Sequence, residues 1–523
     1  MRFENIRTAF LICDLVQVSF PVETLFGLTT AAYPSYNVFR GKVFMERTLR
    51  EKKRREEDFC SRPLLKKIIK FTLPLIFTGV LQLLYNAADI IVVGRFAGTP
   101  AECDRAMAAV GSTGSLVNLI TNLFLGLSVG SLSAMGRCMG AKDGERASRV
   151  EHTSVLISVI GGFVIGIIGF FLSEPLLVLM QTPAEVLPLA TLYLKIYFLG
   201  MPFIALYNFG AAIMRACGDT QRPLIFLAFA GIANVGLNLL LVIAFKMSVA
   251  GVAVATISAQ AVAAVLVTIW LIKGKRYPKL FFKKLKVYKR ELVEIIKIGL
   301  PAGIQGTIFS LSNVIIQSAI NPFGDVVMAG NTASASVEGF VYVSMNSVSQ
   351  ACLTFVSQNY GADRHENIGL ILGQCTLIVT VLGVVLGVAA YFAGGFLCGL
   401  YNANPEVIKY GVERLLYVSV PYCLCGIMEV LVGALRGVGH SFVPMIVSVV
   451  GVCGLRIVWV YTVFAAMNTL AILYISYPVS WGITALVHFI CYLFVSKKEI
   501  GNMKRRRAEK EAAQASAAVE SAQ

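Results

Sequence analysis

Long runs of apolar residues dominate the pattern along this chain of 523 residues. An α-helix needs about 20 mostly apolar residues to cross a lipid bilayer, and twelve runs reach that length. The runs are too long for membrane β-strands and do not alternate between apolar and polar residues. The pattern therefore predicts an all-α polytopic membrane protein, with spans at residues 68–93, 107–135, 151–173, 186–213, 221–245, 250–272, 295–320, 328–357, 367–391, 405–434, 442–466 and 470–495.

Pro74, Pro202, Pro301 and Pro421 lie inside these spans. Proline has no N–H group and leaves a backbone carbonyl of the preceding turn without its usual partner. We therefore expect bends in the spans that contain them.

The composition agrees with a membrane protein, because 56% of the residues are hydrophobic and 15% are charged. Soluble chains carry about a quarter charged residues, so a soluble fold is excluded, and the abundance of apolar residues excludes low-complexity disorder. The net charge of +16 comes from basic residues that lie between the apolar runs. This placement is typical of a membrane surface and argues against a nucleic-acid partner. The twelve cysteines lack zinc-site spacing and are expected to be buried as small apolar side chains.

Lysine and arginine placement predicts the orientation of the chain in the membrane. If the N-terminus is inside, the inner segments hold about 36 of these residues and the outer loops hold about four, Arg95, Arg105, Lys246 and Lys409. Both termini are therefore expected in the cytoplasm.

Three matched segments, in the same order and at a nearly constant spacing, divide the chain into two halves. Ile68 to Pro74 reads IIKFTLP, and Ile295 to Pro301 reads IIKIGLP. The other two pairs are GAKD and GADR, which begin at Gly140 and Gly361, and the loops Arg215 to Pro223 and Arg436 to Pro444. Six spans per half make the repeat parallel, with two lobes related by an axis along the membrane normal. The expected divisions are an N-terminal extension (1–44), a basic cytoplasmic lead-in (45–67), an N-lobe (68–272), a basic cytoplasmic linker (273–294), a C-lobe (295–495) and a cytoplasmic tail (496–523).

The first 44 residues do not continue this pattern. Their apolar stretch, residues 8–20, is interrupted by Asp14 and is too short to span a bilayer. We interpret residues 1–44 as a non-native or dispensable extension that precedes a physiological start at Met45; the alternative is an interfacial helix. The tail is expected to be a cytoplasmic helix or disordered.

The run LPLIFTGVLQLLYNAADIIVVGRFAG (Leu73 to Gly98) resembles the multidrug and toxic compound extrusion (MATE) family, in its bacterial branch of DinF-like and MepA-like proteins. The segments AAVGSTGSLVNL, GAKDGERA and VAGVAVAT and the two Arg–Gly loops add to this resemblance, which covers roughly residues 65–497. It implies a bacterial plasma-membrane exporter of small organic, often cationic, compounds, driven by inward flow of protons or sodium ions through alternating access of the two lobes. It implies no cofactor besides the coupling ion, and we expect a monomer surrounded by lipid.

Asp89 is the first candidate for the coupling ion, because an ionisable group inside a membrane span is costly and points to function. A carboxyl group can load and release a proton or bind sodium through its oxygens. Asn86 lies one turn away, and the repeat maps Asp89 onto Ile316 and Asn86 onto Asn313. The resemblance places the acidic coupling residue of the first span at Asp89, so a sodium ion is a candidate there, and no other metal site is expected. The alternative is that Asp89 serves as a polar anchor near the outer headgroups.

The fifth span departs from the family pattern. Family members often carry Asn-x-x-x-Asp there, whereas this chain reads Asn234-Val-Gly-Leu-Asn238. An amide exchanges no proton near neutral pH, so Asp89 would act with neutral partners. Asn234 and Asn238 are assigned either to the coupling-ion site or to hydrogen bonds between helices.

Substrate contacts are expected from polar and acidic residues of several spans: Gln82, Tyr85, Gln305, Asn313, Glu338 and Glu429. Glu338 and Glu429 either attract organic cations or pair with Arg414 and Arg456. The arginines that end the fourth and tenth spans, Arg215 and Arg436, are interpreted as structural or gate residues.

Several motifs are absent from the sequence. It contains neither the phosphate-binding loop of ATP-driven pumps nor a set of residues for an enzyme active site. The sequence therefore favours a secondary active exporter, and not an enzyme. A flippase of lipid-linked precursors, which shares the two-lobe architecture, is the runner-up, and a channel is third.

Overall fold

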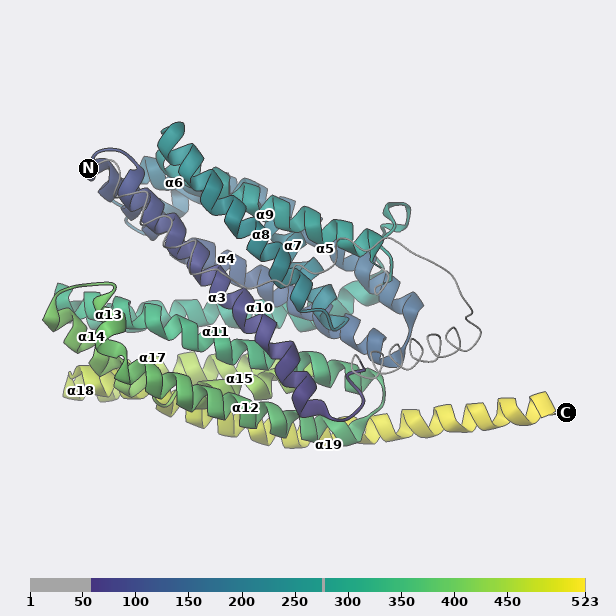
Figure 1. Ribbon diagram of the computed structural model, residues 1–523. Helices are drawn as coiled ribbons and strands as arrows, with labels where there is room; N and C mark the ends of the chain where they lie inside the picture. The colour runs from purple at the N-terminus through teal and green to yellow at the C-terminus, as the bar shows by residue number, and fades with distance from the viewer. Residues whose placement is uncertain (1–57, 275–277, 523) are drawn as a thin grey trace, which may run out of the picture. The chain divides into compact units, whose positions relative to one another are not determined.

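The computed structural model describes residues 58–274 and 278–522, and these residues form the predicted all-α fold (Figure 1). The interpretation of residues 1–44 falls outside the described residues. The first half contains the helices α3 (Leu64–Phe96), α4 (Pro100–Ala141), α5 (Gly144–Leu179), α6 (Leu187–Leu199), α7 (Met201–Ala216), α8 (Gln221–Leu239) with the π-helical turn η1 (Leu240–Ala244), and α9 (Ser248–Lys273).

The second half follows a short 3₁₀ turn, η2 (Phe282–Lys284). It contains α10 (Lys289–Ile320), η3 (Asn321–Phe323), α11 (Asp325–Gly361), α12 (His365–Phe392), α13 (Gly394–Gly399), α14 (Pro405–Val418), α15 (Tyr422–Gly437), α16 (Phe442–Ser448), η4 (Val449–Gly454), α17 (Leu455–Trp459), η5 (Val460–Phe464), α18 (Ala465–Met467) and α19 (Leu470–Ala522). Helix α19 continues through the charged tail as one helix that extends past the other helices (Figure 1).

Within the described ranges, nine helices are long and apolar enough to cross a membrane, and two bent pairs raise this number to eleven. The pairs are α6 with α7 and α14 with α15, each bent by 48°. Pro202 lies at the first break and Pro421 at the second, as expected from their missing N–H groups. The other two prolines behave differently, because Pro74 and Pro301 lie inside the continuous helices α3 and α10.

Helix α11 occupies the place of the remaining predicted span. It is 37 residues long but more polar than the others, and many of its buried residues are serine, asparagine or glutamine. These side chains face protein, since α11 packs against α12, α14 and α15 of its own half and against α3 and α4 of the other half. A polar helix is tolerated in a membrane when it is enclosed by protein. With α11, the described chain has the twelve spans that the apolar runs predict.

The repeat is visible in the backbone of the loops that connect equivalent helices. Lys142 has a φ of 57° after α4, and Asp363, its equivalent in the second half, has a φ of 53° after α11. Gly218 has a φ of 92° after α7, and its equivalent Gly439 has a φ of 97° after α15. These left-handed residues end helices in the same way in both halves.

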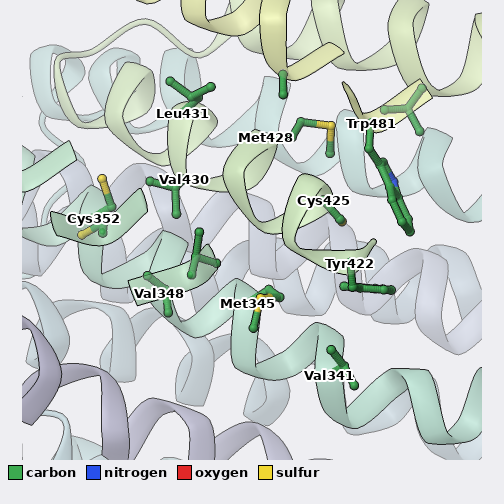
Figure 2. Packing of buried hydrophobic residues seen from close by; sticks show 14 of the residues in the cluster. Val341, Met345, Val348, Cys352, Tyr422, Cys425, Met428, Val430, Leu431 and Trp481 are labelled. Atoms are coloured by element: carbon green, nitrogen blue, oxygen red, sulfur yellow. The ribbon is translucent and has the colours of Figure 1, made fainter. Parts of the chain in front are cut away.

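Inside the second half, α11 packs along α15 with interlocking apolar side chains (Figure 2). Val341, Met345 and Val348 of α11 are buried, as are Tyr422 and Met428 of α15. Helices in lipid gain little from the hydrophobic effect, so close packing of this kind supplies much of their association.

The two halves meet most closely where α4 crosses α10. Gly126 and Gly130 of α4 face Gly299 and Gly303 of α10. A methyl group on Gly126 would lie 2.1 Å from the backbone nitrogen of Gly303. The absence of side chains allows the two backbones to touch, as small residues do in other membrane helix pairs.

Polar contacts between the halves lie mainly beyond this crossing, at the end of the molecule that we call the linker end. It carries the described linker residues, 274 and 278–288, and the loops at 141–144, 216–221, 361–365 and 437–442. Arg137 contacts Glu294 at 3.2 Å, and Arg149 contacts Glu291 at 3.1 Å. The amide of Gln358 donates a hydrogen bond of 2.6 Å to the carbonyl oxygen of Ala216. The halves are therefore joined at the linker end.

Candidate functional site

Asp89 lies in a buried polar cluster formed by three helices of the first half. Its Oδ1 accepts a hydrogen bond of 2.6 Å from Asn238 of α8, and its Oδ2 accepts one of 2.9 Å from Thr256 of α9. Asn234 donates to the Thr256 hydroxyl at 3.3 Å and accepts from Asn238 at 3.2 Å. The side chains of Asp89, Asn234 and Asn238 are all buried. Each carboxylate oxygen is therefore held by a donor from a different helix.

Helical spacing explains why these residues meet. Asn234 and Asn238 are one turn apart and present their amides on one face of α8. Thr256 projects from α9, which packs against α8. Asn86 does not join this arrangement: it is exposed on α3, and no hydrogen bond links it to the cluster in the described part of the chain. The structure thus brings together three of the four predicted ion-coupling residues.

Thr256 was missed by the reasoning from intramembrane charge, because a threonine is neutral and common in membrane helices. It ends the quoted segment VAGVAVAT, where it is the one side chain with a hydroxyl group. Its role depends on contact across helices, which spacing along one helix does not reveal.

The cluster offers oxygen atoms from Asp89, Asn234, Asn238 and Thr256. The carbonyl oxygen of the Asn238 side chain is buried and has no hydrogen-bond partner among the described residues. Carboxylate, amide and hydroxyl oxygens suit a hard cation such as sodium, and the carboxylate alone suffices for a proton. In the described ranges no group of three or more histidine, cysteine or acidic residues could hold a metal ion.

A cavity of about 270 Å³ lies between the two halves, beside the Gly126 crossing. It is lined by α3, α4, α7 and α8 from the first half and by α10, α11 and α15 from the second. Three predicted substrate contacts line it: Gln82, Gln305 and Glu429. Along α3, Gln82 is seven residues from Asp89, which places this part of the cavity wall about 10 Å from the Asp89 cluster.

The other predicted substrate contacts lie elsewhere. The hydroxyl of Tyr85 donates to the carbonyl oxygen of Leu227 in α8, so this side chain binds within the first half. Asn313 is exposed on α10 and is not part of the cavity wall. Glu338 is also outside the wall.

Glu338 forms a buried ion pair with an arginine. Its Oε2 is 2.7 Å from Nη2 of Arg414, which is 4% exposed. Arg414 also donates to the Ser334 hydroxyl at 3.2 Å. The sequence left two roles open for Glu338, and in the structure its carboxylate faces an internal cation.

Arg456 is held differently from Arg414. Its guanidinium group lies 4.1 Å from the centre of the Tyr477 ring, and its Nε donates to Ser480 at 3.1 Å. A cation over an aromatic face is stabilised by the negative potential of the ring. Neither glutamate candidate forms an ion pair with Arg456 in the described part of the chain.

Arg215 and Arg436, the two arginines at the ends of α7 and α15, both line the cavity. Nη2 of Arg436 donates a hydrogen bond of 2.9 Å to Oε1 of Gln305. Glu429 is the acidic residue of the same wall. These three residues give the cavity two positive charges and one negative charge.

Comparisons with known proteins agree on one family. The family model described as MatE matches residues 74–240 and 301–462, one segment in each half. The chain is 29% identical over 402 residues to "Probable multidrug resistance protein YpnP" of Bacillus subtilis (strain 168), covering 76% of this chain and 88% of that relative. It is 22% identical over 387 residues to the multidrug export protein MepA of Staphylococcus aureus (strain MSSA476), covering 73% and 84%.

Solved structures share the fold. A multidrug resistance MATE family transporter of the MOP superfamily, in its outward-facing conformation, superimposes with a TM-score of 0.78 at 22% identity, covering 85% of this chain and 98% of that one. A MATE protein in the bent conformation gives a TM-score of 0.77 at 21% identity, covering 86% and 98%. Because the MatE model matches more than half of the residues, in two segments that coincide with the repeat, the chain belongs to the MatE family, whose members are multidrug efflux transporters of the membrane and not enzymes.

Proposed function

We propose that this protein is a secondary active multidrug exporter, which couples the outward movement of organic compounds to the inward flow of protons or sodium ions. The observation that carries the proposal is the buried Asp89 cluster, placed about 10 Å along α3 from a cavity between the halves. An ion-binding acid and a substrate-sized cavity on one helix are the parts that coupled transport needs. The multidrug names of relatives such as MepA support the substrate class.

Helix α3 provides the physical connection between ion and substrate. Near its beginning, Phe71 packs edge-on against Phe355 of α11, with ring centres 5.6 Å apart. Near its end, Asp89 is held by α8 and α9 of the first half. In between, Thr78 and Gln82 line the cavity. A change in the contacts of Asp89 therefore acts on a helix that touches both halves and the substrate.

We infer an alternating-access mechanism from these contacts. The ion pairs of Glu291 and Glu294 join the two halves at the linker end. Opening at that end requires breaking them and separating the glycine-mediated crossing of α4 and α10. Ion binding drives such a change only if the ion has different affinities for the two states. We assign that difference to the carboxylate of Asp89, whose two donors come from separate helices.

The linker end is assigned to the cytoplasm, and with it both termini, because the basic residues gather there. The protein is assigned to the bacterial plasma membrane, as a monomer that needs no cofactor besides its coupling ion.

The test is efflux from proteoliposomes that contain the purified protein and a fluorescent organic dye. An imposed inward gradient of protons or of sodium should accelerate dye export, and collapse of that gradient with an ionophore should abolish the acceleration. Export that ignores both gradients would contradict secondary active transport.

A flippase of lipid-linked precursors is the second candidate, and the two arginines of the cavity wall favour it, because such lipids carry phosphate. It predicts gradient-dependent movement of a lipid-linked precursor between leaflets in the same proteoliposomes. Export of soluble dyes without any movement of the lipid supports the first candidate.

A further inference from the structure

The cavity between the halves contains more positive than negative charge. Its ionisable groups, apart from tyrosines, are Arg215, Arg436 and Glu429. No ion pair joins Glu429 to either arginine within the described ranges of the chain. Glu429 interacts electrostatically with Arg436 at longer range, whereas no acidic group in the described ranges acts on Arg215 in this way.

Arg215 has hydrogen-bonding capacity that the protein does not use. The structure places no acceptor from residues 58–274 or 278–522 on its guanidinium group, and its Nε is buried and unpartnered. Nη2 of Arg436 donates a hydrogen bond to Gln305, but its Nε is likewise buried without a partner. Polar groups that are removed from water without a partner are costly. Five donors in a planar fork, as arginine has, suit the two oxygens of a carboxylate or phosphate.

The rest of the wall is suited to an apolar body. Leu75, Leu125, Val129, Phe309 and Val343 line the same cavity as the two arginines. Small-molecule sites typically combine such apolar walls with a few polar groups that set orientation.

We propose that Arg215 and Arg436 form an anion-binding pair, and that the transported substrates carry a carboxylate, sulfonate or phosphate group on a mainly apolar body. This inference rests on the proposed export function and narrows its substrate class. It departs from the expectation of organic cations, for which Glu429 is the acid available in the cavity wall. A cationic group elsewhere on the substrate, facing Glu429, is compatible with it, so zwitterions are included.

The test compares two dyes with one chromophore: rhodamine B in its carboxylate form and its ethyl ester, which is a cation without the carboxylate. Binding to the purified full-length protein is measured by fluorescence polarisation. We expect the carboxylate form to bind at least about tenfold more tightly than the ester. Arg215→Gln should weaken binding of the carboxylate form about tenfold and leave the ester unchanged, while Arg215→Lys should retain part of the preference.

Arg95→Gln is the matched control, because Arg95 is an exposed arginine in the last turn of α3, outside the cavity. It should change neither dissociation constant. Equal affinity for both dyes in the wild-type protein, or an equal loss of both dyes in Arg215→Gln, would overturn the proposal, because a residue that only shapes a gate affects both. If Arg215→Gln is not monodisperse, the same two dissociation constants are measured in Arg436→Gln.

Competition distinguishes a soluble anion from a lipid phosphate. Displacement of bound dye by 1-naphthoate supports a soluble organic anion, and displacement by dodecyl phosphate alone supports a lipid phosphate. Displacement by neither, or equally by uncharged dodecanol, contradicts an anion site. Measurement of gradient-driven export distinguishes failure of the anion site from failure of the exporter function. Export of the ester but not of the carboxylate form would reject the anion site and support the exporter. Arginine-dependent binding without gradient-driven export would support the anion site and reject the exporter.

Discussion

Asn238 donates a hydrogen bond of 2.6 Å to Asp89, although the two residues lie 149 positions apart in the chain. The family resemblance predicts a second acid at the position of this amide, so the Asp89 cluster has one carboxylate held by neutral donors. Substitutions of Asp89 and of its hydrogen-bond donors therefore test whether this cluster binds the coupling ion.

Asp89→Asn should abolish gradient-driven efflux while the protein still folds. The variant keeps the size of the side chain, and a flip of the Asn238 amide can present its unpartnered oxygen to the new NH₂ group. It removes the charge on which ion affinity depends, so the two states lose their differential affinity. The initial efflux rate per folded protein, under one fixed gradient, should fall at least about tenfold. A near-normal rate would remove Asp89 from the mechanism.

Thr256→Val should slow gradient-driven efflux about tenfold. A hydrogen bond to a charged group contributes about 1.5–3 kcal/mol, and valine keeps the shape of threonine while it removes the donor to Oδ2. The half-saturating concentration of the coupling ion should shift accordingly. The matched control is Thr268→Val on the same helix, because the hydroxyl of Thr268 donates to the carbonyl oxygen of Ala264 in its own helix. Equal effects of the two variants would argue against a role of Thr256 in ion binding.

Glu338→Gln should destabilise the second half. It leaves Arg414 buried without its ion-pair partner, and loss of one partner of a buried pair costs about 3–5 kcal/mol. We expect a clear fall in the thermal unfolding temperature in detergent, and recovery of most of that fall in the double variant Glu338→Gln/Arg414→Met.

Glu406→Gln is the control for this pair, because Glu406 is exposed in the first turn of α14 and its substitution should leave the unfolding temperature unchanged. If Glu338→Gln were as stable as the wild type and weakened only cationic substrates, Glu338 would be a substrate contact after all.

Gly126→Ala should separate the two halves at their closest crossing. The added methyl group meets the backbone of Ala302 and Gly303, which cannot move aside as a flexible side chain does. The variant should unfold at a lower temperature or lose transport. Gly161→Ala is the control, since its methyl group would lie 3.7 Å from Phe124 in ordinary contact. Wild-type stability and transport in Gly126→Ala would contradict direct backbone contact between α4 and α10 at this crossing.

The orientation can be checked with cysteine probes at two loops. Lys142 lies at the linker end, and Ala403 lies in the loop before α14 at the other end, and both are exposed. In a background without other reactive cysteines, an impermeant thiol reagent added to intact cells should label Ala403→Cys and not Lys142→Cys. Labelling of both from outside would reverse the assignment of the linker end to the cytoplasm.

The sequence by itself determined the number of spans, the repeat and the position of Asp89, the acid proposed for ion coupling. Apolar runs reveal spans because the bilayer core has a set thickness, and matched segments such as Gly140 and Gly361 reveal the repeat because equivalent loops share a local conformation. Asn234 and Asn238 could be placed on one face of a helix from their spacing. Each of these features can be recognised in short continuous stretches of the chain.

Only the tertiary structure decided which side chains meet across helices. Thr256 joins Asp89 because α9 packs beside α8, and Glu338 pairs with Arg414 because α14 packs along α11. Arg215 and Arg436 end their helices as expected, yet both line the cavity, since two halves that are separate in the chain come together there. Packing of the whole bundle decides which neighbouring helix a given helix face contacts. The hydrophobicity of one segment does not identify that neighbour.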